Sequence, residues 1–221
     1  MSEHLILASN EAGQGLSVRY QWQRDRFQHT ICVQGDVASD WLVSDEADAP
    51  SDAWPADPPL QQVSVEPIAG HDAVLAVGQA GCGHWSSSAE ALTIDSLPAL
   101  RFDIACRFPE PPLFLGSQYR IASDTPQVEL AGGTAWLREP SGVLRLQAQV
   151  PATAASSPSQ PVSSSVSLAA SEGDTDLAAI GDVVWQFDAS KRLLRLVVND
   201  PGQEVPRTAR WQLTVTWQPA S

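Results

Sequence analysis

Apolar and polar residues alternate with a period of two along most of the chain. The alternation is clearest in residues 16–22, 27–33, 100–108 and 211–217. Because successive side chains of a β-strand point to opposite faces, this period predicts strands with one buried and one solvated face. No window shows a convincing 3.6-residue period of an amphipathic helix. The sequence therefore predicts an all-β protein.

Short polar breaks join several of these strands into hairpins. Residues 23–26 separate the first pair, and residues 188–192 separate two further apolar runs, at 183–187 and 193–198. Weaker alternation adds candidate strands at 61–66, 73–77, 85–94, 127–130, 134–138 and 143–150. Many short strands separated by turns are typical of an antiparallel two-sheet β-sandwich. The alternative is an up-and-down β-barrel, lipocalin-like in layout only.

Two long segments do not follow the strand pattern. Residues 36–59 contain seven acidic residues and no basic one, and we expect a long acidic loop held down by its own aromatic side chains. Residues 151–176 are rich in Ser, Ala and Pro. Such a composition buries too little apolar surface to offset chain entropy, which predicts a mobile, disordered insertion. The roughly 45 residues that follow are few for a separate core, so we expect residues 1–221 to form a single domain.

The charge of the chain restricts its partners. Twenty-six acidic and thirteen basic residues give a net charge of −13. Binding to phosphates requires clustered Lys and Arg, so nucleic acid and anionic membranes are disfavoured, which leaves a protein partner or a small ligand. Twelve of the bases are Arg, and we expect many of them to pair with acids on neighbouring strands, such as Asp103 or Glu129.

The cysteines and the first residues of the chain indicate a compartment. Cys32, Cys82 and Cys106 are an odd number without paired spacing. Residues 1–11 lack the basic start and the about 7–15 apolar residues of a signal peptide. No stretch reaches the about 18 apolar residues of a membrane span. We therefore expect a soluble, cytoplasmic protein with reduced thiols.

The glycine-rich segment 78–90 brings a thiol, an imidazole and an indole close together in sequence. Cys82 and His84 are metal-ligand types, and an imidazole can also activate a thiol. The other Cys and His residues show no metal-ligand spacing. We therefore predict no metal and no cofactor. The favoured interpretation is a tight turn that leads into a strand whose Trp85 packs in the core.

The acidic segment raises a calcium hypothesis. Residues 45–52 carry carboxylates at positions i, i+1, i+3 and i+7, but lack the glycine and the final glutamate of an EF-hand loop. A solvated, self-repelling loop is the favoured interpretation.

Eight tryptophans are a large supply for a chain of this length. Exposed on one sheet, they would stack on sugar rings; buried, they would fill the space between two sheets about 10 Å apart. Apolar neighbours on the same face favour burial of Trp22, Trp211 and Trp217. By contrast, we expect Trp41 and Trp54, in the acidic loop, to be partly exposed.

No catalytic motif has the structural context that its chemistry requires. We therefore expect a non-catalytic binding or protein-interaction domain, with His84, Trp85, Glu90, Tyr119 and Arg120 as candidate ligand contacts. The alternative is a hydrolase that acts on a glycan or ester from a β-sandwich cleft, with His84 and Glu90 as acid and base. Its weakness is that residues i and i+6 of one strand are about 20 Å apart. A structural subunit would instead show a large apolar patch or an exposed sheet edge.

Overall fold

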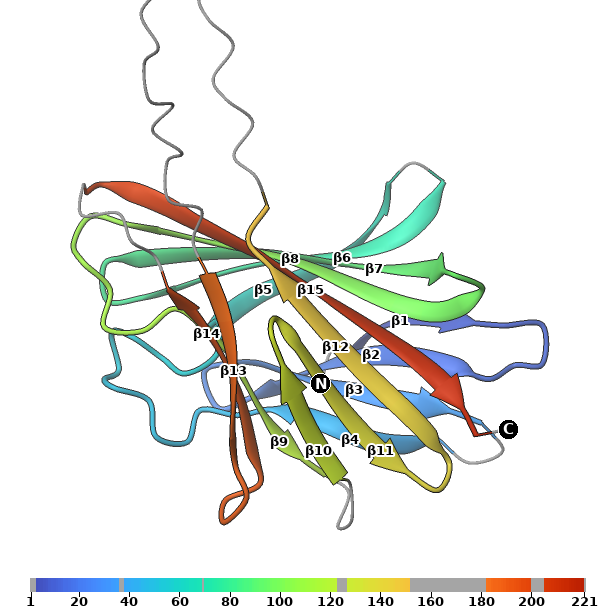
Figure 1. The fold of residues 1–221 in the computed structure, drawn as a ribbon. Coiled ribbons are helices and arrows are strands. Elements are labelled where there is room, and N and C mark those ends of the chain that lie inside the picture. The colour runs from blue at the N-terminus through green and yellow to red at the C-terminus, as the bar shows by residue number, and fades with distance from the viewer. Residues whose placement is uncertain are drawn as a thin grey trace, which may run out of the picture.

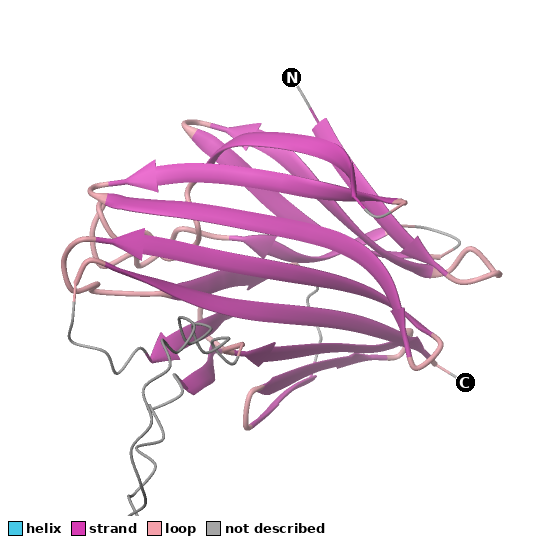
Figure 2. Cartoon of the chain, turned by 90° about the horizontal axis from the view of Figure 1, so that it is seen from above, coloured by secondary structure: helices cyan, strands magenta, loops and turns pink. Residues whose placement is uncertain are grey.

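All regular secondary structure in the described part of the chain is β-strand. The computed structural model describes residues 3–35, 38–68, 70–122, 127–151, 182–199 and 205–220. Fifteen strands lie in these residues (Figures 1 and 2). They are β1 (Glu3–Ser9), β2 (Gly15–Gln23), β3 (Arg26–Gln34), β4 (Ser39–Ser44), β5 (Leu60–Ile68), β6 (His71–Ala80), β7 (Gly83–Ile94), β8 (Leu97–Phe108), β9 (Gly116–Ile121), β10 (Gln127–Ala131), β11 (Thr134–Glu139), β12 (Gly142–Gln149), β13 (Asp182–Asp188), β14 (Leu193–Asn199) and β15 (Arg207–Pro219).

The strands form two antiparallel sheets that pack face to face as a β-sandwich. The seven-stranded sheet has the order β1-β2-β3-β4-β9-β14-β13, and the eight-stranded sheet has the order β10-β11-β12-β15-β8-β7-β6-β5. The two sheets are not closed into a barrel (Figure 1). The predicted sandwich is thus confirmed, and the barrel alternative is not the fold. Among the described residues there is no helix with the length and apolar character needed to cross a membrane.

The middle of the eight-stranded sheet joins segments that are far apart in the sequence. β15 lies between β12 and β8, and its long pairing with β8 runs from Arg207 opposite Phe108 to Thr216 opposite Ala99. On the outer face of this pair, the Arg210 guanidinium donates to Asp103. This is a cross-strand Arg–Asp pair of the kind that the arginine-rich composition predicts.

One hydrophobic core lies between the sheets. Alternate residues of β15 point into it, and Trp211, Leu213 and Val215 are completely buried. Trp217, Trp85 and Trp185 are buried as well. The predicted burial of Trp85, Trp211 and Trp217 is therefore correct.

Three strands of the seven-stranded sheet were absent from the expected set. β1 has a short apolar run, β4 lies inside the acidic segment, and β9 carries buried Ser117 and Gln118 in place of apolar residues. In β9 the alternation of apolar residues is weak because polar Ser117 and Gln118 take buried positions, and the Gln118 side chain forms hydrogen bonds there. In β1 and β4 the apolar run is too short to stand out as a strand. The segment 36–59 is consequently not one long loop.

Three tryptophan predictions were wrong. Trp41 and Trp54 are buried, with 2% and 4% of their surface exposed. Trp41 packs edge-on against Trp217 at 5.0 Å between ring centroids, so the expected pinning by aromatic side chains is correct although the expected exposure is not. Trp22 is 39% exposed, because the last three residues of β2 extend beyond the core.

The remaining sequence predictions have mixed outcomes. Cys32 and Cys106 are buried and Cys82 is half-buried, and all three are free thiols. The turn before β7 delivers Trp85 to the core as expected. The Ser/Ala/Pro-rich segment 151–176 lies outside the described residues except for its first residue.

Candidate functional site

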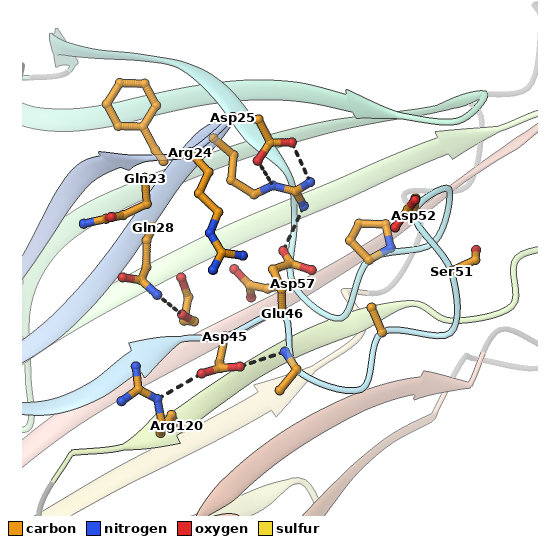
Figure 3. Close-up of a pocket in the computed structure, with 16 residues that line it drawn as sticks. Gln23, Arg24, Asp25, Gln28, Asp45, Glu46, Ser51, Asp52, Asp57 and Arg120 are labelled. Atoms are coloured by element: carbon orange, nitrogen blue, oxygen red, sulfur yellow. Dashed lines mark hydrogen bonds and ion pairs between the residues drawn. The ribbon is translucent and has the colours of Figure 1, made fainter.

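A polar cavity of about 570 Å³ opens at one end of the sandwich. It lies between the β2–β3 turn and the segment that follows β4, and side chains from both converge on it (Figure 3). Its volume is within the usual range of small-molecule sites. The lining residues are Gln23, Arg24, Asp25, Arg26, Phe27, Gln28, Ser44, Asp45, Glu46, Ala47, Ala49, Ser51, Asp52, Pro55, Asp57 and Arg120.

Local structure holds both walls of this cavity in place. Arg24 adopts a left-handed backbone conformation with φ 58°, which lets the two-residue turn reverse the chain between Gln23 and Arg26. On the other wall, the Trp54 ring packs edge-on against Trp85 of the other sheet, with 6.0 Å between centroids. The acidic segment is therefore anchored by the core and presents its polar side chains to the cavity.

The floor of the cavity is the buried carboxyl group of Asp57. This residue is only 4% exposed. Its Oδ1 accepts a hydrogen bond from the backbone N–H of Gln118 at 3.3 Å. Burial raises the pKa of Asp57 well above its ordinary range, and the nearby Glu46 carboxylate raises this pKa further. The site thus favours the protonated form of this carboxyl group.

Behind Asp57 lies a buried imidazole. His29 Nδ1 is 3.8 Å from Asp57 Oδ2, which is too long for a hydrogen bond. Nδ1 has no hydrogen-bond partner among the described residues. His29 Nε2 is 3.2 Å from the Tyr119 hydroxyl, which is itself fully buried. Because no close charge offsets the burial, desolvation lowers the pKa of His29 to about 4, and the imidazole is neutral at pH 7.

Two buried tyrosines complete this cluster. The Tyr20 and His29 rings lie 5.5 Å apart between centroids. Burial raises the pKa of both Tyr20 and Tyr119, and the Asp57 carboxyl adds to the effect. Neither phenol is therefore poised to lose its proton near neutral pH. The Tyr20–His29–Asp57–Tyr119 group is a set of hydrogen-bonding groups in a dry environment rather than an activated nucleophile.

Ion pairs fix most of the charged rim. Arg26 donates to Asp25 and to Glu46, each at 3.0 Å. Arg120 Nε donates to Asp45 Oδ2 at 2.9 Å. These ion pairs give the charge of each of the two arginines a partner, and they hold the carboxylates in place around the opening.

Two lining residues of opposite charge are left without such a pair. Among the described residues, neither Arg24 nor Asp52 makes a side-chain hydrogen bond or a close ion pair; the charge of Arg24 acts on Asp25 only from beyond ion-pair distance. Figure 3 shows the Arg24 side chain extending from the turn toward the middle of the lining residues. A cationic and an anionic group are thus available at one cavity.

The structure distributes the predicted contact residues over several places. Arg120 lines the cavity and pairs with Asp45, whereas Tyr119, its neighbour on β9, points the other way into the buried cluster beneath. His84 lines a separate depression of about 470 Å³ together with Cys82. Trp85 is core.

Glu90 has a structural partner. Its Oε1 accepts a hydrogen bond from Arg101 Nε at 2.8 Å, and its Oε2 is 3.2 Å from His71 Nε2. His84 and Glu90 are at opposite ends of an uninterrupted stretch of β7, so the structure does not bring them together.

The residues that the sequence analysis missed are Arg24, His29 and Asp57. A signal for His29 exists, because it replaces an apolar residue at an inward position between Phe27 and Ile31. Asp57 gives no such signal. Its neighbours in sequence suggest a solvated loop, and only the folded chain shows that it is buried.

Metal binding and similarity to known proteins give no further assignment. No group of three or more His, Cys, Asp or Glu side chains in the described ranges is arranged to hold a metal ion. No protein-family model matches the chain, and neither a curated protein nor a solved structure matches it.

Proposed function

We propose that the protein is a non-catalytic binding domain for a small zwitterionic ligand, held in the cavity above Asp57. The observation that supports this most directly is the presence of two unpaired side chains of opposite charge, Arg24 and Asp52, on one polar cavity. A ligand with a negative and a positive group complements both. The net charge of −13 disfavours a purely anionic ligand at long range.

The lining groups support recognition of a ligand rather than its chemical conversion. Gln23 and Gln28 present amides, and the paired carboxylates on the rim present further acceptors. The Ser51 and Ser44 hydroxyls are engaged with backbone N–H groups, of Trp54 at 3.2 Å and of His29 at 3.0 Å. A nucleophile hydrogen-bonded to a base is not found among these lining residues.

Isothermal titration with small zwitterions tests the proposal. The panel contains amino acids and glycine betaine, with acetate and choline as ligands that carry only one of the two charges. We expect binding of a zwitterion and no measurable binding of the single-charge compounds. Arg24→Gln should weaken binding by about 10- to 100-fold, as expected for a hydrogen bond to a charged group.

The matched control is Arg145→Gln on the outer face of β12. Arg145 bonds only to Gln147 in the described chain and lies away from the cavity. This variant should bind like the wild type. Equal affinity of wild type and Arg24→Gln for every ligand that binds contradicts the proposed site, and the absence of binding by all zwitterions contradicts the proposed ligand class.

A further inference from the structure

In the described part of the chain the two sheets have four edge strands, and one of them combines an apolar side-chain row with few protecting residues. The edges are β1 and β13 in the seven-stranded sheet and β10 and β5 in the eight-stranded sheet. An edge strand exposes unpaired backbone N–H and C=O groups, which can pair with a strand of another chain. Natural proteins block this pairing with charges, proline or bulges.

β1 has few of these devices. Its five central residues, His4 to Ala8, contain no acid, lysine, arginine or proline. Leu5 and Leu7 point away from the core and are 55% and 52% exposed, whereas Ile6 and Ala8 point into it and are buried. On the outer face, the neighbours of Leu5 and Leu7 on β2 are Arg19 and Ser17. The edge therefore combines free backbone groups with an apolar side-chain row.

The other three edges oppose pairing with their own copy. Consider each edge strand paired antiparallel, over its full length, with the same strand of a second copy related by a two-fold axis. In β13, Asp182 then lies opposite Asp188 of the copy, and in β10, Glu129 lies opposite Glu129 of the copy. Like charges directly opposite each other are destabilising. β5 contains Pro67, which has no N–H to donate to the ladder.

When β1 is paired in the same way with β1 of a second copy, the residues that face each other are compatible. With Ile6 on the two-fold axis, Leu5 of one copy lies opposite Leu7 of the other, and Leu7 opposite Leu5. The only acid of the strand, Glu3, lies opposite Ser9 and is already within 3.6 Å of Arg19 of its own chain. No two charges of one sign face each other across this edge. Such reciprocity is the property of a two-fold interface.

We propose that β1 is a homodimerisation edge, at which two copies pair antiparallel through residues 3–9. The seven-stranded sheets of the two copies then become one continuous sheet, with four leucines packed on its outer face. The occupant is a second copy because this strand is self-complementary in charge and in the placement of its leucines. This inference does not depend on the proposed ligand, since the cavity and β1 share no residue.

Mass measurement by light scattering after size exclusion, in 0.15 M NaCl to screen the net charge, tests the dimer. We expect the wild type to approach twice the monomer mass of 23.7 kDa as its concentration rises. The double variant Leu5→Lys with Leu7→Lys should stay monomeric, because it places lysines opposite lysines. Both side chains are more than half exposed, so the variant should keep its fold, which circular dichroism verifies.

The matched control is Leu113→Lys, which changes a leucine that is 68% exposed and lies outside the strands. It should dimerise like the wild type. A wild type that is monomeric at all concentrations overturns the proposal. A dimer that persists in the double lysine variant overturns it as well.

Cysteine cross-linking tests the register. In a Cys82→Ser background, Leu5→Cys and Leu7→Cys are prepared separately and then mixed. The mixture should form an intermolecular disulfide under mild oxidation, and neither variant alone should do so, because residues 5 and 5, or 7 and 7, are then diagonal and too far apart. Cross-linking of either variant alone, or none in the mixture, contradicts the register.

Discussion

The buried imidazole of His29 should make the protein sensitive to acid, by an amount that follows from its pKa. The pKa is 6.5 for an ordinary histidine and about 4 for His29 in the folded chain, because burial disfavours the charged form. Between these values the unfolded chain binds a proton that the folded chain does not, so stability falls as the pH decreases from 6.5 toward 4. The expected loss of stability from this group is about 2 kcal/mol at pH 5 and is negligible at pH 7.5.

Urea unfolding of the wild type and of His29→Gln, at pH 7.5 and at pH 5, measures this quantity. Other groups also titrate over this range. The raised pKa of Asp57 acts in the opposite direction, since the folded chain then holds its proton more tightly and gains stability as the pH falls. Asp57 is present in both proteins, so its contribution largely cancels in the difference between them. We expect the wild type to lose about 2 kcal/mol relative to His29→Gln on going to pH 5.

The sign of the result separates two electrostatic states of the cluster. If His29 and Asp57 formed a buried ion pair, the pKa of His29 would rise and the wild type would gain stability relative to the variant as the pH falls. That outcome, or a difference independent of pH, refutes the reasoning. His84→Gln is the control because it removes an imidazole that the fold does not bury. Nitrogen chemical shifts of the His29 ring report its protonation state directly.

Two further predictions concern the core and the thiols. Trp41→Ala should lower the free energy of unfolding, measured in urea, by about 3–5 kcal/mol, as for other buried aromatics. Trp22→Ala should lower it distinctly less, because the Trp22 side chain is 39% exposed. Similar losses of stability at both positions contradict the assigned burial. The Cys82 thiol donates a hydrogen bond to Glu110 at 3.0 Å, and this contact raises the pKa of Cys82. Glu110→Gln should therefore speed alkylation of Cys82 by iodoacetamide at pH 7.5. Mass spectrometry should find one adduct per folded chain, and more only after urea unfolds the protein and exposes the two buried thiols. An unchanged rate of alkylation argues against control of the thiol by the carboxylate.

The sequence predicted the sandwich because apolar residues at every second position indicate strands that bury the side chains of one face. It could not predict the order of strands, since the same alternation in β8 is compatible with many neighbours. It also missed β9, where Gln118 is completely buried and donates to the backbone carbonyls of Asp45 and Ala47 at 3.1 and 2.6 Å. A glutamine at this position looks solvated until the segment after β4 is placed beside it.

The candidate site was harder to predict, for a related reason. Its parts come from the β2–β3 turn, β3, β9 and the acidic segment, and no short motif contains them. Charge counting favoured a solvated loop for residues 45–52 within the acidic segment, although Asp57 in the same segment is buried. The distinction depends on Trp54, whose packing in the core draws the acidic segment inward. Only the tertiary structure contains that information.

The position of β15 between β8 and β12 has a consequence for the order in which the chain folds. Its partners on β8 precede it by about one hundred residues, so this pairing is highly non-local and slow to form. During synthesis, β8 and β12 each have one edge without its partner strand until β15 is made. The eight-stranded sheet cannot be completed before β15 has been synthesised, and until then it presents unpaired strand edges of the kind that makes folding intermediates prone to aggregation.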